Sequence, residues 1–297
     1  MAFTHLHVHT EYSLLDGSNK IKEYVARVKE LGMDSAAITD HGVMYGVIDF
    51  YRAAKAAGIN PILGCEVYVA PGSRFDREIG SGDDRYYHLV LLAENNQGYQ
   101  NLMKIVSKSF KEGFYYKPRV DLELLREYHE GLIALSACLA GEVARFLTRG
   151  MYPDAKKAAL RYQEIFGEGN FFLELQDHGI PEQQNVNQQL LRMHQETGID
   201  LVATNDIHYT YKEDADPHDI LLCLQTGKKL SDTDRMRYEG GQYYVKSEQE
   251  MAALFPYALE ALENTHKIAE RCHVEIEFGV TKLPRFDVPD GYTSWEY

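Results

Sequence analysis

The stretch Phe3-Thr4-His5-Leu6-His7-Val8-His9-Thr10 alternates histidine with threonine or an aliphatic residue. In a β-strand, residues two apart point to the same face, so this pattern predicts a first strand with His5, His7 and His9 along one side. A single histidine is common in a protein core, but three in register are poorly suited to an apolar one. Because imidazole is a frequent ligand of transition metals, the stretch predicts a metal site at one end of this strand.

The composition is ordinary for a globular protein, with 297 residues, 44% of them hydrophobic and 26% charged. The sequence has no apolar run of about 18 residues, and its first residues lack a basic segment followed by an apolar one, so we expect neither a membrane span nor a signal peptide. The cysteines are widely spaced and form no C-x-x-C pair, which favours a reducing cytoplasm over a disulfide framework (Cys65, Cys138, Cys223, Cys272).

Acidic residues outnumber basic ones, with 45 Asp and Glu against 31 Lys and Arg and a formal net charge of −14. An extended nucleic-acid groove normally shows a basic excess. If this chain handles nucleic acid, we therefore expect a small site at which metal supplies the positive charge, or another domain that holds the strand.

Short apolar segments alternate along the chain with segments of helical periodicity. The predicted strands are residues 3–10, 35–39, 61–69, 87–93, 132–138, 171–176 and 201–206. Predicted helices include residues 21–31, 45–57, 96–110 and 182–197, where apolar residues recur three or four apart. This alternation predicts βαβ units and a mostly parallel sheet, either doubly wound or closed into a barrel, and the first-strand histidines favour the barrel.

The remaining segments are predicted to be helical, looped or extended. Helices are expected at 247–255 and 257–272, the first with a capping box of Ser247 and Glu250. The polar, glycine-rich segment 71–85 predicts an exposed loop or hairpin. We assign residues 1–280 to one domain and interpret the Pro-rich residues 281–297 as an extended linker at the start of a truncated further domain.

Side chains able to bind metal lie near the end of almost every predicted strand. They are His7, His9, Asp16, His41, Glu66, His88, Cys138, Asp206 and His208. In parallel α/β folds, the carboxyl ends of the strands meet at one rim and form the site. His88 is the exception because it begins its strand, and we retain it on the assumption that the preceding insert brings it over the barrel mouth. A ring of this kind predicts metal binding.

These segments resemble the PHP family, named for polymerases and histidinol phosphatases. The resemblance is carried by Leu6-His7-Val8-His9-Thr10, Ile38-Thr39-Asp40-His41-Gly42, Gly64-Cys65-Glu66 and Asn205-Asp206-Ile207-His208. Residues 9–17, 93–102 and 171–176 resemble more specifically the N-terminal PHP domains of bacterial replicative DNA polymerase III alpha subunits, and this similarity covers essentially the whole chain. The Pro-rich tail resembles the entry into the palm domain of those subunits.

The resemblance implies an α/β fold, a distorted seven-stranded, TIM-like β/α barrel followed by a C-terminal helical segment. It also implies three divalent metal ions, with zinc favoured and manganese, iron or magnesium at some positions. The first ion would take His7, His9, Glu66 and Asp206, the second Glu66, His88 and Cys138, and the third Asp16, His41 and His208. Asp206, His208 and Glu66 are also expected to act in catalysis.

The expected charges suit a phosphodiester substrate. Three carboxylates and the Cys138 thiolate supply about −4, and three divalent ions supply about +6, which leaves about +2. The expected chemistry is metal-assisted attack of hydroxide on phosphorus, with Cys138 as a ligand and not a nucleophile.

We therefore expect a metal-dependent 3′–5′ exonuclease that proofreads during DNA replication. The expected partners are a single-stranded or frayed DNA 3′ end, the remainder of the polymerase alpha subunit and other replisome subunits, with no membrane contact. Two alternatives are a catalytically silent hub that docks a separate proofreading subunit and a phosphomonoesterase of the histidinol-phosphatase type. The complete set of ligands argues against the first alternative, and the tail argues against the second.

Four further side chains are assigned from their positions. His178, after the sixth predicted strand, is a candidate contact for substrate phosphate. His5 lies one step deeper than His7, and we expect it in the core or behind the ligands. Asp40 is expected to cap a turn or support a ligating histidine. Cys65 alternates with Glu66 and should therefore face the helices.

Overall fold

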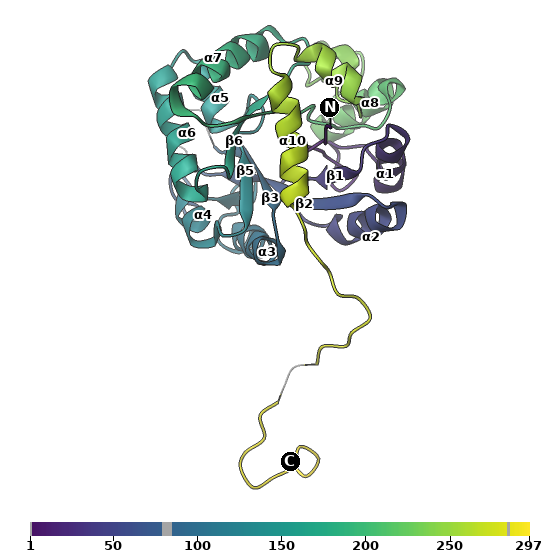
Figure 1. The fold of residues 1–297 in the computed structure, drawn as a ribbon, viewed down its shortest axis with the longest axis vertical. Helices are drawn as coiled ribbons and strands as arrows, with labels where there is room; N and C mark the ends of the chain where they lie inside the picture. The colour runs from purple at the N-terminus through teal and green to yellow at the C-terminus, as the bar shows by residue number, and fades with distance from the viewer. Residues whose placement is uncertain (1, 79–84, 284–285) are drawn as a thin grey trace.

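Residues 2–78, 85–283 and 286–297 are described by the structure, a computed structural model (Figure 1). The strands in these residues are β1 (Ser35–Ile38), β2 (Asn60–Val69), β3 (Tyr87–Ala93), β4 (Arg119–Val120), β5 (Leu132–Leu135), β6 (Phe171–Leu175) and β7 (Leu201–Ala203). The α-helices are α1 (Ile21–Glu30), α2 (Val47–Ala57), α3 (Asn96–Lys111), α4 (Leu122–Tyr128), α5 (Glu142–Thr148), α6 (Tyr152–Phe166), α7 (Pro181–Thr197), α8 (Ala215–Thr226), α9 (Glu248–Leu254) and α10 (Leu259–Arg271). Short 3-10 turns, η1 (Lys212–Asp214) and η2 (Glu239–Gly241), lie before and after α8.

The strands form one curled sheet in the order β1-β2-β3-β5-β6-β7, with β4 beside β2. Neighbouring strands are parallel except at β3, which runs antiparallel to both β2 and β5. The start of β3 therefore lies at the same end of the sheet as the carboxyl ends of β2 and β5. The predicted α/β fold with a seven-stranded curled sheet is confirmed, with one strand reversed.

The N-terminal segment, residues 3–10, is not a regular strand, so that part of the prediction is wrong. It makes a single parallel bridge, between Val8 and Ile207. Its backbone bonds to both neighbours, since the His9 amide donates to Ile207 at 2.8 Å and the Thr39 amide donates to Val8 at 2.9 Å. The segment thus joins the two outer strands of the curled sheet, and the seventh strand is the unpredicted β4. A bend at His7 interrupts the expected alternation of side chains.

The interior of the curled sheet is apolar at one end. Its buried cluster comprises Leu6, Ala37, Ile62, Val90, Leu92, Ile133, Leu135, Ala137, Phe172, Val202, Ile268, Ala269 and Cys272. The last three of these belong to or directly follow α10, which lies across the sheet in Figure 1. A larger apolar core lies between the strands and the outer helices. Because α10 fills one end of the interior, the other end is left for polar side chains.

Local sequence accounts for several of the helices. In α1, the residues Ile21, Tyr24, Val25 and Val28 recur at helical spacing and are all buried. The predicted capping box is confirmed, because Ser247 accepts from the Glu250 amide and Glu250 accepts from the Ser247 amide. Helices α4, α5 and α6 were not predicted from the sequence. None of the helices in the described residues combines the length and hydropathy that a membrane span requires.

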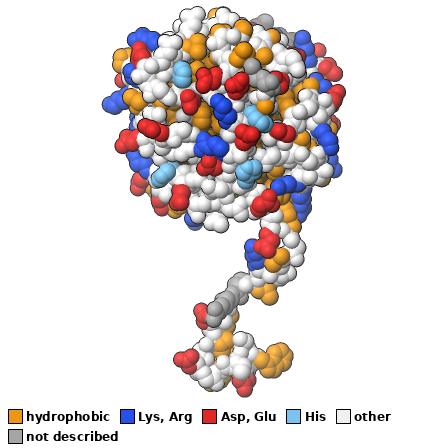
Figure 2. All heavy atoms as spheres, in the orientation of Figure 1, with side chains coloured by type: hydrophobic (Ala, Val, Ile, Leu, Met, Phe, Trp, Pro, Cys, Tyr) orange, Lys and Arg blue, Asp and Glu red, His pale blue; other side chains and the backbone are white. Residues whose placement is uncertain are grey.

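Two predicted segments lie mainly on the outside of the molecule. Residues 79–84 of the predicted insert lie outside the described residues, and residues 71–78 form turns and bends. Residues 281–283 and 286–297 run away from the rest of the molecule in Figure 1, and the described part of residues 273–297 contains neither helix nor strand. The domain boundary at residue 280 stays a prediction. On the face seen in Figure 2, Lys and Arg side chains are interspersed with Asp and Glu.

Candidate metal centre

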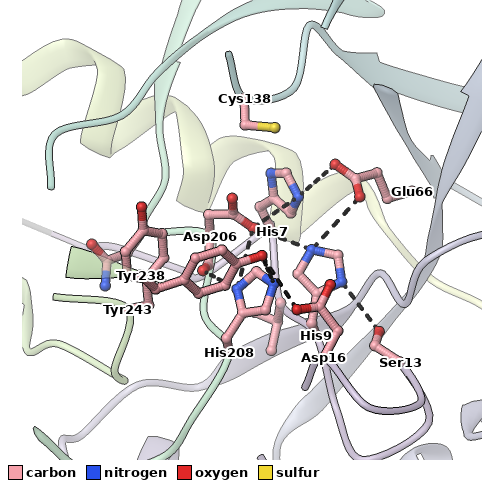
Figure 3. Close-up of polar contacts among 12 residues, drawn as sticks. His7, His9, Ser13, Asp16, Glu66, Cys138, Asp206, His208, Tyr238 and Tyr243 are labelled. Carbon is pink, nitrogen blue, oxygen red and sulfur yellow. Dashed lines mark hydrogen bonds and ion pairs between the residues drawn. The ribbon is translucent and has the colours of Figure 1, made fainter. Parts of the chain in front are cut away.

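The side chains predicted to bind metal converge at the end of the interior opposite α10. Figure 3 shows His7, His9, Asp16, Glu66, Asp206 and His208 facing one another, with Cys138 at the edge of the group. His88 joins them because β3 runs antiparallel to β2. The first residues of β3 therefore lie at the same rim as the last residues of β2. The insert before His88 is therefore not the reason for its position, contrary to the expectation from the sequence.

Glu66 lies at the centre of the group. It belongs to β2, and its carboxylate is buried in the interior of the curled sheet, where it contacts His7. One carboxylate oxygen, Oε1, lies 3.2 Å from His7 Nε2 and 2.9 Å from His88 Nδ1. The other, Oε2, lies 2.5 Å from His41 Nδ1. A buried carboxylate contacted by three imidazoles is the main feature of this site.

Two further carboxylates complete the polar end. Asp206 Oδ1 lies 3.3 Å from His7 Nε2 and 3.1 Å from His9 Nε2. Asp16 Oδ2 lies 2.9 Å from His41 Nε2. The imidazole of His9 stacks on that of His41, with ring centroids 3.8 Å apart, and lies 4.4 Å from the ring of His208. Cys138 is more distant, with its sulfur 3.8 Å from His88 Nδ1.

Three groups of side chains have ligand atoms within 4.8 Å of one another, close enough to hold a metal ion: His7 with His9 and Glu66, His41 with Glu66 and His88, and His9 with His41 and His208. These groups correspond broadly to the three sites that the family resemblance implies. They differ in that His41 belongs to both the second and third groups, His9 belongs to both the first and third, and Asp16, Cys138 and Asp206 belong to none of them.

The hydrogen bonding of these atoms fits a metal centre. Within the described residues, six buried atoms of the ring have no hydrogen-bond partner of suitable geometry: His7 Nε2, His9 Nε2, His41 Nδ1 and Nε2, Glu66 Oε2 and Asp206 Oδ1. Leaving one buried polar group unsatisfied costs about 1–3 kcal/mol. Several such atoms aimed at a common space are therefore better explained by shared cations than by packing.

The ionisation of the group supports the same interpretation. Burial disfavours the imidazolium of His41, but the charges of Glu66 and Asp16 outweigh it and raise the pKa of His41 to about 10. Burial also opposes ionisation of Glu66, but the charges of His88 and His41 hold its pKa well below the usual range. Burial, with the charges of His41 and His208, lowers the pKa of His9 to about 3. A proton on His41 thus supplies positive charge next to the carboxylates, the charge that a bound metal ion would otherwise supply.

Glu174, on β6, supports His7 and was not singled out from the sequence. Its Oε1 lies 2.7 Å from His7 Nδ1, and it also accepts from Gln176 Nε2 at 3.0 Å and from the Thr204 hydroxyl. A carboxylate that accepts from the second nitrogen of a metal-binding histidine fixes its tautomer and orientation. A sequence signal was present, because Glu174 interrupts an otherwise apolar strand, Phe171–Leu175.

Asp40 supports His9 indirectly. Asp40 accepts from the Thr10 amide at 2.6 Å and from the Ser13 hydroxyl at 2.7 Å, and Ser13 Oγ lies 3.2 Å from His9 Nδ1. Cys65 is buried in the outer core and donates to the Asp40 carbonyl at 3.3 Å. Ser13 was also not predicted, since a serine in a turn carries no distinctive signal.

Strained backbone occurs beside several of these residues. Asp206 has φ of +45°, and Leu15 and Ala137, which directly precede Asp16 and Cys138, have φ of +61° and +63°. Residues other than glycine rarely adopt this conformation, which costs on the order of 1–3 kcal/mol. Such strain is concentrated at functional sites, and here it directs three of the predicted ligands.

Two histidines stay apart from the group. His178 has both ring nitrogens engaged, by the Asn205 carbonyl at 2.9 Å and by Gln183 Nε2 at 2.9 Å, and it stacks on Tyr243. Its contact with substrate stays a prediction. His5 bonds to the Lys246 carbonyl at 2.8 Å and packs against Phe3, away from His7 and His9.

Comparison with known proteins shows the family to which this chain belongs. The family model described as PHP domain matches residues 5–178, more than half of the chain. The chain therefore belongs to the PHP domain family. It is also similar along its whole length to the DNA polymerase III subunit alpha of Treponema pallidum, with 46% identity over 297 residues that cover 100% of this chain and 25% of that protein.

The DNA polymerase III subunit alpha of Borreliella burgdorferi is likewise 46% identical over 288 residues, 97% of this chain and 25% of that protein. The chain thus spans about a quarter of the length of the curated relatives it matches. Among solved structures, an amidohydrolase from Chromobacterium violaceum has a TM-score of 0.46 and 15% identity, covering 70% of this chain and 88% of that one.

Proposed function

We propose that this chain hydrolyses phosphodiester bonds at DNA 3′ ends, as the metal-dependent 3′–5′ exonuclease domain of a replicative polymerase alpha subunit. The observation that carries the proposal is the buried Glu66 carboxylate, contacted by His7, His41 and His88 and surrounded by unsatisfied ligand atoms. Similarity to DNA polymerase III alpha subunits supports DNA as the substrate. The remaining partners in the proposal are the rest of that subunit and other replisome subunits.

The proposed ligands are the nine side chains named from the sequence, in three groups. His7, His9, Glu66 and Asp206 form the first, Glu66, His88 and Cys138 the second, and Asp16, His41 and His208 the third. Divalent ions bound there would lower the pKa of water to give a nucleophile and would stabilise charge on phosphoryl oxygens. The mixture of imidazole, carboxylate and thiolate favours zinc, with manganese, iron or magnesium at positions without sulfur.

The chain's own residues fix protons around this centre. With its Nδ1 bonded to Glu174, His7 directs Nε2 toward Glu66 and Asp206. The Tyr238 hydroxyl lies 3.3 Å from both Asp16 Oδ1 and His208 Nε2. Burial and the charges of Asp16 and Asp206 raise the pKa of Tyr238 well above its usual value, so its hydroxyl stays protonated. In the structure this hydroxyl donates to Asp16 Oδ1, and in the proposed reaction a phosphoryl oxygen takes the place of Asp16 as its acceptor, a role supported by the position of Tyr238 beside the ligands in Figure 3.

The test is release of nucleotides from 3′-labelled single-stranded DNA by purified, metal-loaded protein. Asp206→Asn and His9→Ala should each lower the rate by about 1,000-fold or more, because each removes a proposed metal ligand while preserving the fold. Asp200→Asn is the matched control, since this exposed carboxylate lies just before β7, at the opposite end of the strand from Asp206. Its activity should equal that of the wild type.

Other outcomes would select an alternative function. A metal-loaded wild-type protein that releases no nucleotide from any DNA end would support the silent hub. Release of phosphate from phosphomonoesters, without cleavage of DNA, would support the histidinol-phosphatase type. Full nuclease activity in both Asp206→Asn and His9→Ala would place the chemistry elsewhere in the chain.

A further inference from the structure

Half of the residues that line a cavity beside the proposed metal centre have side chains with rings. Its volume is about 220 Å³, and both Asp16 and His41 contribute to its wall. The rest of the wall is mostly aromatic or apolar and includes Tyr12, Tyr45, Tyr68, Phe110 and Pro118. The cavity therefore connects two proposed metal ligands directly to an aromatic surface. None of the contacts described above gives this aromatic surface a role.

The turn between β1 and α2 holds this surface in place. A Cβ atom on Gly42 would lie 2.8 Å from Tyr68 Cε2, and one on Gly46 would lie 2.6 Å from Tyr12 Cδ2. Gly42 also has φ of +64°, a conformation that other residues rarely adopt. The two glycines let the turn pack closely on two tyrosine rings, and Tyr45 lies in the turn between them.

Apolar side chains are exposed at this cavity. Tyr45 is 60% exposed and Leu14 is 69% exposed, although both line the cavity. Tyr68 is buried, and its ring lies nearly parallel to the imidazole of His41, with an interplanar angle of 19° and centroids 6.3 Å apart. Exposed apolar groups next to a functional site commonly mark a binding surface. Here the aromatic surface extends outward from the proposed metal ligand His41.

One cation completes the cavity wall. Lys117 Nζ lies 5.4 Å from the centroid of the Tyr68 ring, and it forms no ion pair with any carboxylate that the structure describes. A second cation lies over the neighbouring tyrosine, since Arg85 is 4.4 Å from the ring of Tyr116, which is itself 60% exposed. Aromatic rings interleaved with cations are the combination by which proteins bind single-stranded nucleic acid without reading its sequence. On a chain of net charge −14, such a combination is notable.

We propose that this cavity binds the terminal nucleotide of a DNA 3′ end, with the base stacked at Tyr45 and a phosphate held by Lys117. This inference rests on the proposed nuclease function and adds that any base is accepted. Stacking requires only a π face and no particular pattern of hydrogen bonds. Two hydroxyls at the cavity are already engaged, since Tyr12 donates to Asp49 at 2.9 Å and Ser13 donates to Asp40.

The test compares binding of dTMP, dAMP and 2-deoxyribose 5-phosphate to the zinc-loaded protein by titration calorimetry. Each nucleotide should bind with an affinity at least about 10-fold higher than that of the sugar phosphate, because base stacking supplies the additional binding free energy. Tyr45→Ala should remove this advantage, whereas Tyr45→Phe should keep it. Tyr257→Ala removes a tyrosine of similar exposure, 51%, that does not line the cavity, and should behave as the wild type. Lys117→Gln should weaken all three ligands by a similar factor.

Three results would overturn the subsite. They are equal affinity for nucleotides and sugar phosphate, absence of binding, and a higher affinity for nucleotides that persists in Tyr45→Ala. Nuclease activity measured on the same samples separates the two proposals. DNA cleavage without Tyr45-dependent nucleotide binding would refute the subsite and retain the function. Tyr45-dependent binding without cleavage would retain the subsite and refute the function.

Discussion

The two ends of the interior of the curled sheet are both buried, but they are filled by opposite kinds of side chain. On β2, Ile62 lies in the apolar cluster that α10 covers, whereas Glu66, four residues later on the same face, contacts three imidazoles. On β6, Phe172 and Glu174 make the same change over two residues. The same strands thus supply a stabilising core at one end and a chemical site at the other.

The energetic consequences of the two ends differ. Burial of apolar side chains against α10 contributes about 25 cal/mol for each Å² removed from water. Burial of ligand atoms that lack hydrogen-bond partners at the other end costs free energy unless cations are bound. We therefore expect substitutions at the apolar end to change stability, and substitutions at the polar end to change metal binding and catalysis. Four predictions test this division, from the largest expected effect to the smallest.

Leu92→Ala should lower the free energy of unfolding by about 2–5 kcal/mol, because it opens a cavity in the fully buried cluster beneath α10. Urea denaturation of the metal-free protein measures the change. Metal content of the folded variant should equal that of the wild type. Loss of metal together with stability would show that the two ends do not act independently.

Cys138→Ser should lose about one equivalent of zinc when zinc is limiting, since a hydroxyl replaces the only sulfur ligand proposed. Metal analysis after dialysis measures the loss, and some loss from the neighbouring ion is expected because Glu66 is proposed to bridge. The unfolding free energy of the metal-free variant should change by less than about 1 kcal/mol. Full zinc content and activity in Cys138→Ser would remove this residue from the ligand set.

Glu174→Gln should weaken zinc affinity or activity by about 10- to 100-fold, the usual effect of losing a carboxylate that orients a metal-binding histidine. Competition with a chromogenic chelator measures the affinity. The control is Glu164→Gln, which alters a carboxylate on the outer helix α6. If Glu174→Gln and the control behave alike, the contact with His7 has no role in metal binding.

Metal affinity should rise with pH between about 6 and 8. The carboxylates raise the pKa of His41 to about 10 in the metal-free protein, so a metal ion must displace a proton to use this imidazole. The apparent affinity should increase by about tenfold per pH unit for each proton released. In the metal-free protein the sign is opposite: the stability that His41 contributes is complete below about pH 6.5 and is lost as the pH rises through about 10. A metal affinity that is independent of pH would contradict protonated His41.

The sequence was sufficient to identify the α/β fold, six of the seven strands of the sheet, and the family. Apolar segments and helical periodicity located most strands and more than half of the helices, because both signals depend on residues close together in the chain. The nine proposed ligands could be named from the sequence alone because their residue types are unusual beside apolar strands. Their convergence, from His7 to His208, agrees with the rule that sites form where parallel strands end.

Only the tertiary structure decided how those residues meet. Strand direction depends on pairing between distant segments, so the reversal of β3 that explains His88 could not be deduced from its own sequence. The support of His7 by Glu174 joins residues 167 positions apart. The aromatic cavity likewise combines Tyr45, Tyr68 and Lys117 from three separate segments. Local sequence records what each residue can do chemically, whereas the contacts that use this chemistry depend on packing among segments far apart in the chain.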